Sequence, residues 1–204
     1  MRSVTRRTGE RGSDRRLAVE ESLQGAMERL LEKGSSFTQV SVEQLATEAG
    51  ISRATFYLHF RDKGELVARL MARVTAEIIA ASTLDSPETV TREALKKTVK
   101  AVVTAYHRHY AVMAAIVETA AYDEQVELLF REMMDQLIDV NRRALQRLKQ
   151  AGRIPDDVVP QVAEVITWAF ERSCHQLLRS RKPAQVNAAS EALTHVIWNS
   201  LYAF

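Results

Sequence analysis

Apolar residues recur every three or four positions along most of the chain, which is the spacing of one face of an α-helix. In residues 14–33, for example, Leu17, Leu23 and Leu30 fall on one side of a predicted helix that Gly34 would end. No stretch of alternating apolar and polar residues is long enough to predict a strand. The pattern therefore predicts an all-α protein of about nine helices.

Capping residues set several of the other expected boundaries. Ser41, Ser52 and Asp62 each precede a helical segment as a good N-cap, and Gly50 and Gly152 each follow one as a stop. A further break is expected at residues 85–87. Beyond the first helix, we expect helices over about 42–50, 52–59, 62–82, 88–109, 110–121, 123–151, 157–180 and 184–202.

Residues 41–60 predict two short helices joined by a tight turn. In a helix-turn-helix the first helix packs steeply on the second, so the contact needs a small residue and the turn needs a residue that tolerates positive φ. Ala46 and Gly50 fit these requirements, and Ser52 would cap the second helix and leave its N-terminus free to approach DNA. Because ordinary bundles also contain two helices joined by a glycine turn, this spacing alone leaves both interpretations open.

The next stretch is more specific, since residues 50–66 read GISRATFYLHFRDKGEL. They match every position of the signature of the tetracycline-repressor (TetR) family, G-[IV]-S-x-x-x-hydrophobic-Y-x-[HY]-F-x-x-K-x-x-L. Residues 37–46 are also similar to the stretch between the family's first and second helices. On this resemblance, the chain is identified as a member of the TetR family. The resemblance implies a flexible basic arm (1–13), a helix-turn-helix DNA-binding domain (14–66) and a ligand-binding and dimerisation domain (67–204).

The function that this resemblance implies is a homodimeric transcriptional repressor, which binds a palindromic double-stranded DNA operator and is released by a lipophilic small-molecule effector. The second helix of the motif is then expected in the major groove, with its N-terminal side chains nearest the bases. Arg53 is the best direct reader, because a guanidinium can donate two hydrogen bonds to one guanine. Ala54 and Thr55 can offer methyl groups to a thymine. The other expected contacts, mostly to phosphates, are Ser41, Gln44, Ser52, Tyr57, His59 and Lys63.

A palindromic operator requires a twofold dimer whose reading helices lie roughly 34–36 Å apart. In the family, the last two helices pair with those of the partner subunit as a four-helix bundle. The candidate interface residues come from the last expected helix: Ala189, Leu193, Val196, Ile197, Ser200 and Leu201. Such a stripe is also ordinary packing within one chain, so both roles fit the pattern.

A ligand pocket is expected among the helices of residues 88–181. Aromatic side chains combined with flexible methionines suit an adaptable apolar pocket, although the same stripe can pack a solid core. Tyr106, Glu118, Asn141 and Thr167 are the conceivable polar anchors. The candidate lining residues are Val103, Tyr106, Tyr110, Met113, Ile116, Val117, Phe130, Met133, Met134, Leu137, Thr167, Trp168 and Phe170.

The C-terminal region is similar to that of a mycobacterial subgroup of the family that controls ethionamide activation. The similarity rests on residues 192–202, which read ALTHVIWNSLY, and on Glu171 followed by Arg172. In that subgroup, two asparagines before the Glu-Arg pair help to bind ligands in a long apolar tunnel. Thr167 and Phe170 stand at the matching positions here, so the polar recognition is altered and the same ligand is not implied.

Charge adds one feature to this picture. The chain of 204 residues has 28 Lys and Arg against 26 Asp and Glu, a net charge of +2. Residues 17–64 carry an acidic excess, and residues 65–204 are balanced. A basic arm precedes them, and it fits either contacts with DNA or a solvated tail. In this arm, Glu10 and Asp14 are outnumbered by the arginines Arg2, Arg6, Arg7, Arg11, Arg15 and Arg16.

Several other classes of protein are not supported. A single cysteine, Cys174, excludes an internal disulfide framework and a cysteine-rich zinc site. No glycine-rich phosphate loop, H-E-x-x-H or G-x-S-x-G motif occurs, so we expect no catalytic residue, metal or cofactor. No apolar run approaches the roughly 20 residues of a membrane helix, and we expect a cytoplasmic protein with no membrane partner.

Two alternatives to the ligand-released repressor stay open. One is a DNA-binding regulator without an inducer, either constitutive or dependent on a co-repressor, which a core without a pocket would favour. The other is a helical small-molecule-binding protein whose DNA-binding head is vestigial.

Overall fold

The computed structural model describes residues 5–84, 86, 89–179 and 182–202, and side chains from residue 16 onward. Within these ranges the chain forms nine α-helices and no strand, so the expected all-α class is confirmed. The helices are α1 (Thr5–Glu32), α2 (Val42–Glu48), α3 (Arg53–His59), α4 (Lys63–Ser82), α5 (Arg92–Arg108), α6 (Tyr110–Thr119), α7 (Glu124–Gln150), α8 (Val162–Leu177) and α9 (Pro183–Leu201).

The predicted helix-turn-helix is present, and local capping sets its boundaries. Ser41 caps α2 in a complete capping box, because its hydroxyl accepts from the Gln44 N–H and the Gln44 side chain accepts from the Ser41 N–H. Ser52 and Asp62 cap α3 and α4, each accepting a hydrogen bond from the backbone N–H three residues later. Gly50 makes the turn at φ +69°, a conformation that side chains other than hydrogen disfavour.

The first helix begins earlier than predicted. It starts at Thr5 rather than near residue 14, so residues 5–13, which were expected as a flexible arm, continue α1. Arginine and glutamate favour helix, no proline interrupts this stretch, and its two glycines each cost only about 1 kcal/mol relative to alanine. The expected arm residues 1–4, including Arg2, lie outside the described residues, as do the side chains of Arg6, Arg7, Arg11 and Arg15.

Two later helices begin further along the chain than predicted. Helix α5 starts after Thr91, whose hydroxyl caps it by accepting from the Ala94 N–H, and not near residue 88. Helix α8 starts at Val162 and not near residue 157. Pro160 explains this second difference, because the proline ring disfavours helical backbone angles at the preceding residue, Val159. The expected break at residues 85–87 lies mostly outside the described residues.

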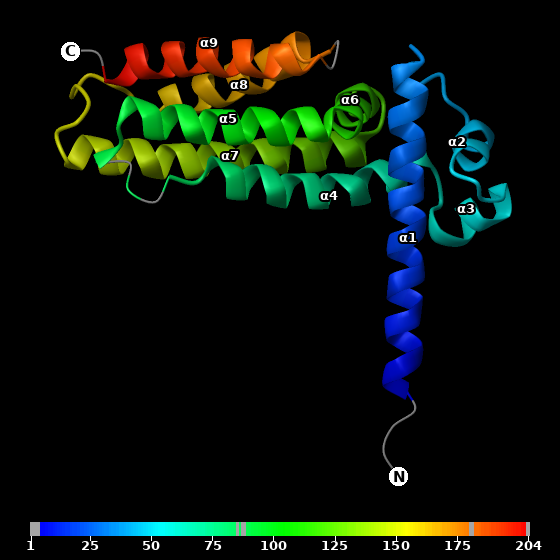
Figure 1. Cartoon of the computed structure of the whole chain (residues 1–204). Coiled ribbons are helices and arrows are strands. Elements are labelled where there is room, and N and C mark those ends of the chain that lie inside the picture. The colour runs from blue at the N-terminus through cyan, green and yellow to red at the C-terminus, as the bar shows by residue number, and fades with distance from the viewer. Residues whose placement is uncertain (1–4, 85, 87–88, 180–181, 203–204) are drawn as a thin grey trace.

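Most of the helices form one elongated bundle. Helices α4, α5, α7, α8 and α9 run side by side, while α1 crosses the end of this bundle next to α6 (Figure 1). Helices α2 and α3 lie on the far side of α1, away from the bundle (Figure 1). Helix α3, which is expected to read DNA, is therefore held at one end of the molecule (Figure 1).

A continuous apolar core joins the helix-turn-helix to the bundle. Phe56 and Phe60 lie buried under α3 and belong to the same cluster as Leu66 and Leu70 of α4 and Met113 of α6. Helix α4 thus runs from the helix-turn-helix into the bundle, and the expected domain boundary after residue 66 falls inside it. In the described part of the chain, no helix is both long enough and apolar enough to span a bilayer.

Candidate DNA interface and ligand pocket

Helix α3 turns its expected base-reading side chains to solvent. Arg53 and Ala54 are exposed, and Tyr57 is 47% exposed while its neighbour Phe56 is fully buried. The Arg53 guanidinium lies 5.5 Å from the centre of the Tyr57 ring, close enough for a cation–π contact. Thr55 is half-buried, and its N–H donates to the Ser52 hydroxyl. Base contact by Arg53, Ala54 and Thr55 stays a prediction.

The remaining expected DNA contacts border the same surface. Ser41, Gln44 and Ser52 are exposed, and His59 is half-buried. Leu58, which is 80% exposed on α3, was not among the contacts expected from the sequence. Its spacing of four residues from Ala54 was the available signal, since this spacing places both on one helix face. Leu58 is therefore a further candidate for apolar contact with DNA.

The Lys63 side chain contacts backbone carbonyl groups, which is not the position expected of a phosphate ligand. Its ammonium donates to the carbonyl oxygens of Phe37 at 2.9 Å, Thr38 at 3.3 Å and Val40 at 2.6 Å. An ammonium has three donors, so the turn between α1 and α2 uses all of them. Burial lowers the pKa of Lys63 below its usual value, and the nearby Glu118 charge opposes this shift. To bind a phosphate, the ammonium would have to give up one or more of these hydrogen bonds to carbonyl oxygens. Phosphate contact by Lys63 stays a prediction.

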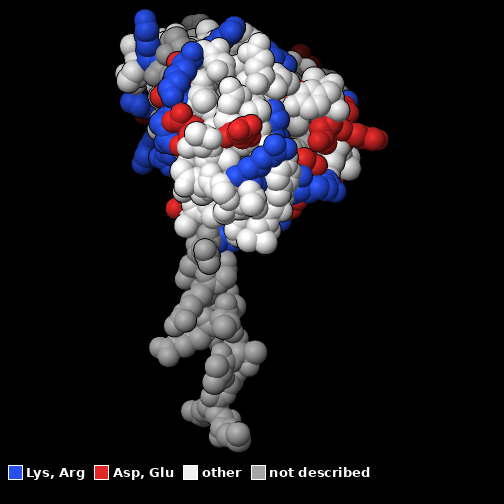
Figure 2. All heavy atoms as spheres, turned by 90° about the vertical axis from the view of Figure 1, so that its right-hand side faces the viewer, with Lys and Arg blue, Asp and Glu red and all other residues white. Residues whose placement is uncertain are grey.

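The surface around α2 and α3 is not a basic patch. Figure 2 shows this end of the molecule, where Lys and Arg side chains are mixed with acidic and uncharged ones. The acidic excess of residues 17–64 agrees with this view. Any affinity of this surface for DNA must therefore come from individually placed groups such as Arg53, not from bulk charge.

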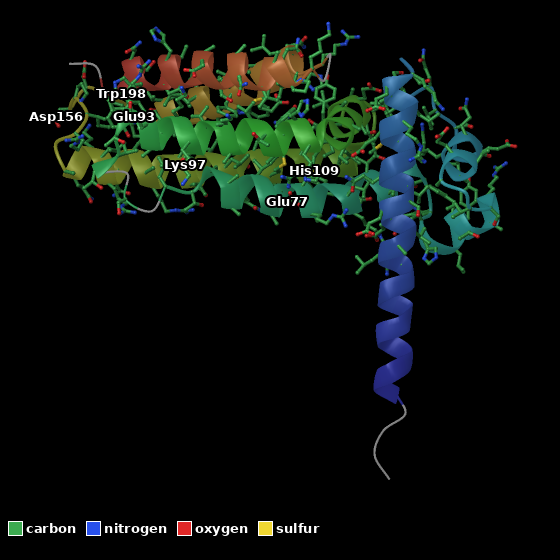
Figure 3. All side chains as sticks on the ribbon, in the orientation of Figure 1. Glu77, Glu93, Lys97, His109, Asp156 and Trp198 are labelled. Atoms are coloured by element: carbon green, nitrogen blue, oxygen red, sulfur yellow. The ribbon has the colours of Figure 1, made fainter. Side chains whose placement is uncertain are left out.

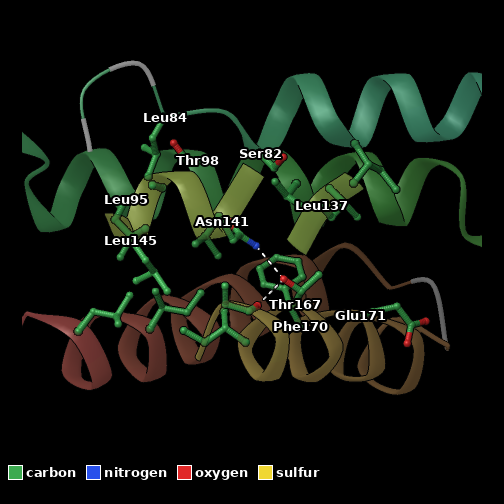
Figure 4. Close-up of a pocket in the computed structure, with 18 of the residues that line it drawn as sticks. Ser82, Leu84, Leu95, Thr98, Leu137, Asn141, Leu145, Thr167, Phe170 and Glu171 are labelled. Carbon is green, nitrogen blue, oxygen red and sulfur yellow. Dashed lines mark hydrogen bonds between the residues drawn. The ribbon is translucent and has the colours of Figure 1, made fainter. Parts of the chain in front are cut away.

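A cavity of about 130 Å³ lies inside the bundle and is lined mostly by apolar side chains (Figure 4). It draws residues from α4, α5, α6, α7, α8 and α9. Of the expected pocket residues, those that border it are Tyr106, Met113, Met133, Met134, Leu137, Thr167 and Phe170.

The other expected pocket residues do not border this cavity. Trp168 is 38% exposed and packs edge-on against Phe130, with 5.9 Å between ring centres. Helical spacing identifies the inward side of a helix, but it does not show which part of that side adjoins a void. The expected residues that lie away from the cavity are Val103, Tyr110, Ile116, Val117, Phe130 and Trp168.

The sequence prediction missed several lining residues. Some belong to α4 and α9, outside the helices of residues 88–181, and others continue the apolar face of a helix within that range. Helix α5 contributes residues at positions 95, 99, 102 and 106, which form one helical face. This regular spacing was the signal that could have found them. The missed apolar lining residues of α4, α5 and α9 include Ile78, Leu95, Val99, Val102, Ile197 and Leu201.

Two polar groups in the middle of the cavity satisfy each other. The Asn141 side chain donates to the Thr167 hydroxyl at 2.9 Å, and this hydroxyl donates to the Ala163 carbonyl at 2.7 Å (Figure 4). Asn141 and Thr167 were both expected as polar anchors, and both border the cavity.

A second polar group lies at one end of the cavity. Glu171 is 5% exposed, and its Oε1 accepts a hydrogen bond from the Tyr106 hydroxyl at 3.2 Å. The same hydroxyl lies 3.4 Å from Nδ1 of His175. Burial raises the pKa of Glu171 above its ordinary value, and the charge of Arg172 opposes this shift. Cys174 beside them is buried, and burial raises the pKa of its thiol, so it is a poor nucleophile.

The residues expected at the dimer interface lie on two different faces of α9, one buried and one exposed. Ala189, Leu193 and Leu201 are buried within the subunit, and Ile197 borders the cavity, so these four are unsuited to an interface between subunits. Val196 is 57% exposed, and Ser200 is also exposed. Other exposed residues on α9 and α8 are Ala188, Ala192, His195, Asn199, Val165 and Trp168.

Helices α6 and α7 contact the segments on either side of the helix-turn-helix, at Thr38 before α2 and at Gly64 in α4. The Glu118 carboxylate accepts from the N–H of Thr38 at 3.1 Å and from its hydroxyl at 3.2 Å, so Glu118 is not the pocket anchor considered above. Asp123, the N-cap of α7, lies against Gly64 at the start of α4, where any side chain would overlap its carboxylate.

A third contact joins α4 to the junction of α5 and α6. His109 is buried there, and its Nε2 lies 2.8 Å from the Glu77 carboxylate (Figure 3). This hydrogen bond is the main reason that the pKa of Glu77 is lowered. This pair therefore ties α4 to the junction of α5 and α6.

A reading helix at one end and a cavity between the helices behind it are the two parts of a ligand-binding transcription regulator. Residues 23–70 match the bacterial regulatory proteins of the tetR family, and residues 95–203 match the C-terminal domain of the transcriptional regulator EthR. The chain belongs to the TetR family and is a transcriptional regulator of that family. Members of this family are DNA-binding regulators and not enzymes.

Individual relatives agree over nearly the whole chain. The HTH-type transcriptional regulator EthR of Mycobacterium tuberculosis is 27% identical over 196 residues, which cover 94% of this chain and 88% of that protein. The TetR family regulator PfmR from Thermus thermophilus has the same fold, with a TM-score of 0.69 and 20% identity over 86% of this chain and 96% of that one. FadR from Bacillus subtilis, in complex with stearoyl-CoA, has a TM-score of 0.69 and 13% identity over 91% and 99%.

Proposed function

We propose that the protein is a homodimeric repressor, which binds a palindromic operator through α3 and is released when a lipophilic molecule enters the cavity of the bundle. The apolar cavity itself carries this proposal, because natural cores are close-packed and rarely leave such a space. An apolar space between the helices, behind an exposed α3, favours a ligand-responsive regulator over one that needs no ligand.

In this proposal the two α3 helices of the dimer enter successive major grooves. Arg53 reads a guanine, and Ala54, Thr55 and Leu58 contact neighbouring base edges. Phosphate contacts by Ser41, Gln44, Ser52, Tyr57, His59 and Lys63 fix the position of each subunit. The exposed side of α8 and α9 around Val196 and Trp168 pairs with the same surface of the partner subunit.

Ligand entry changes the distance between the reading helices by widening the cavity. A cavity of about 130 Å³ is close in size to one of about 150 Å³ that holds a single benzene ring. A larger effector must therefore displace the walls, which include α4, α6 and α7. Their contacts at Glu118–Thr38, Asp123–Gly64 and Glu77–His109 pass this displacement to the helix-turn-helix. The population that fits the operator then falls, and DNA is released.

Binding-site selection with the purified full-length protein tests the DNA part of this proposal. We expect one palindromic sequence to be enriched, and Arg53→Ala to weaken its binding by about 1–3 kcal/mol and to relax selectivity at one position of each half-site. Arg131→Ala on α7 is the matched control, because Arg131 is exposed and pairs only with Glu127 on its own helix among the described contacts. Enrichment of no sequence, or equal effects of the two variants, would contradict the proposal.

A thermal-shift screen of lipophilic compounds tests the ligand part. A compound that raises the melting temperature should also lower operator affinity in a titration. A compound that binds in the cavity and leaves operator affinity unchanged would contradict release by ligand.

A further inference from the structure

We infer that the ligand of the cavity is a lipophilic amine, whose protonated nitrogen binds the carboxylate of Glu171 at one end while its apolar part fills the rest. The inference rests on the proposed function, because it specifies the chemical class of the effector for the same cavity.

The first observation is an unpartnered oxygen. In the described part of the chain, two buried side-chain polar atoms have no hydrogen-bond partner, Oε2 of Glu171 and Nδ1 of His109. Of these two residues, only Glu171 borders the cavity. Buried polar atoms in folded proteins nearly always have a partner, so an unpartnered oxygen on a residue that lines the cavity points to a partner that arrives with a ligand, and a small rotation of the Glu171 side chain would bring this oxygen within its reach.

The second observation is the arrangement of the other polar groups. Asn141 and Thr167 are bonded to each other, and the Ser82 hydroxyl donates to the Ile79 carbonyl at 2.9 Å. Glu171 lies apart from this pair, toward one end of the lining residues (Figure 4). Glu171 is the one charged residue among the described lining residues, and it lies at one end of a mostly apolar cavity, which matches a molecule with one charged head.

The chemistry of a carboxyl group selects the head. Oε1 is already occupied by Tyr106, so Oε2 remains to accept a hydrogen bond from the ligand. A hydroxyl or an ammonium can donate, and an ammonium also neutralises the carboxylate, which gives a stronger, charge-assisted bond in a site with little water. A carboxylate head would place two negative charges together, which is unfavourable. A fatty acid is therefore the wrong ligand for this end of the cavity.

A matched series of probes tests the head group. The probes are 4-phenylbutylamine, 4-phenylbutanol, 4-phenylbutyrate and butylbenzene, which share an aromatic ring and a short chain. Binding to the full-length protein is measured at pH 7.5 by calorimetry and thermal shift, without DNA. We expect the amine to bind about tenfold or more tightly than the alcohol, followed by the hydrocarbon and last by the acid.

Variants locate the effect. Glu171→Gln should remove the preference for the amine over the alcohol, whereas Glu164→Gln, an exposed position on the same helix, should leave it unchanged. Tyr106→Phe keeps the carboxylate and removes its partner, so the preference for the amine should persist. This second variant keeps the test valid if Glu171→Gln folds poorly.

The inference is overturned if the acid binds as well as the amine, if Glu171→Gln keeps the preference, or if no probe binds. Because the measurement uses no DNA, failure of the protein to select an operator would count against the proposed function and leave this result standing.

Discussion

The Glu171 side chain makes the stability of the fold depend on pH in a particular direction. Burial raises its pKa above the ordinary value of 4.5, so the folded protein holds this proton more tightly than the unfolded chain does. The resulting contribution to stability is complete below about pH 4.5 and is lost as the pH rises through the folded-state pKa. Urea denaturation measures the difference in unfolding free energy between Glu171→Gln and wild type. We expect this difference to move in favour of the variant as the pH rises from 4 to 8.

The exposed Glu164 provides the control for this pH series. Glu164→Gln on the same helix should show a constant difference from wild type across this range. His175, whose pKa is lowered mainly by burial, titrates in all three proteins, so its contribution largely cancels in the comparison. A constant difference for Glu171→Gln as well would show that the carboxyl has no raised pKa.

Gly64 is a residue whose missing side chain matters. A Cβ at this position would overlap the carboxylate of Asp123, which caps α7 by accepting from the Val126 N–H. We expect Gly64→Ala to destabilise the fold by about 1–2 kcal/mol, since the cap must move or the helices must separate. In an Asp123→Ala background the same change should be neutral or slightly stabilising, because alanine favours helix over glycine.

A double-mutant cycle with urea denaturation measures this coupling directly. Additive effects of the two substitutions would contradict a direct contact between the start of α4 and the start of α7. The signature of the family leaves position 64 open, so sequence reasoning had no reason to single out this glycine.

The helices differ in how well the sequence predicts them, and the difference follows from where their ends are determined. Caps at Ser41, Ser52 and Asp62 act through hydrogen bonds within three residues, so α2, α3 and α4 begin where the sequence predicts. The start of α8 at Val162 has no side-chain cap, and the sequence prediction places it too early because it does not take Pro160 into account. Local chemistry is visible in a sequence, whereas an uncapped end depends on packing.

The pocket is predicted less well for a related reason. An apolar side chain at helical spacing points inward whether it meets a neighbour or a void, so Met133 and Phe130 look alike in the sequence. Only the packing of α7 against α8 places Phe130 beside Trp168 and Met133 beside the cavity. Glu171 enters the prediction through its resemblance to a subgroup, yet its buried pairing with Tyr106 required the distance between α5 and α8.

The arginine-rich segment at the N-terminal end of α1 is expected to contact DNA phosphates. Residues 2–12 contain four arginines and one glutamate, a concentrated positive charge. Deleting them should make the dependence of log affinity on log salt less steep by about 1–3, because each phosphate contact contributes about 0.9 to this slope. Sequence preference should stay largely the same. Operator titrations at several salt concentrations measure both, and an unchanged slope would exclude DNA contacts by this segment.

At the scale of the whole molecule, charged and apolar side chains are distributed differently over two regions of the surface. The DNA-binding end has a mixed surface charge, whereas the outer side of α8 and α9 exposes Val165 at 66%, Val196 at 57% and Trp168 at 38%. Exposed apolar side chains that are contiguous usually mark an interface. In the proposed dimer, this surface would set the spacing of the two α3 helices without occupying the expected DNA surface, because α8 and α9 lie in the bundle and α3 lies on the other side of α1 (Figure 1).

Charge placed on this outer side should therefore abolish cooperative reading of a palindrome. Ala192→Arg or Val196→Arg would bring like charges together across a twofold axis, and we expect sedimentation velocity to show a monomer. Affinity for the full palindrome should fall by about 10²- to 10⁴-fold, since the second half-site is no longer bound intramolecularly, while affinity for a single half-site stays the same. Leu128→Arg is the control, because Leu128 is 58% exposed on α7 and should leave the dimer intact. A Val196→Arg variant that remained dimeric with full operator affinity would show that the subunits associate through another surface. A ligand in the cavity between α4, α5, α7 and α8 would then have to change the spacing of the two α3 helices in a differently arranged dimer.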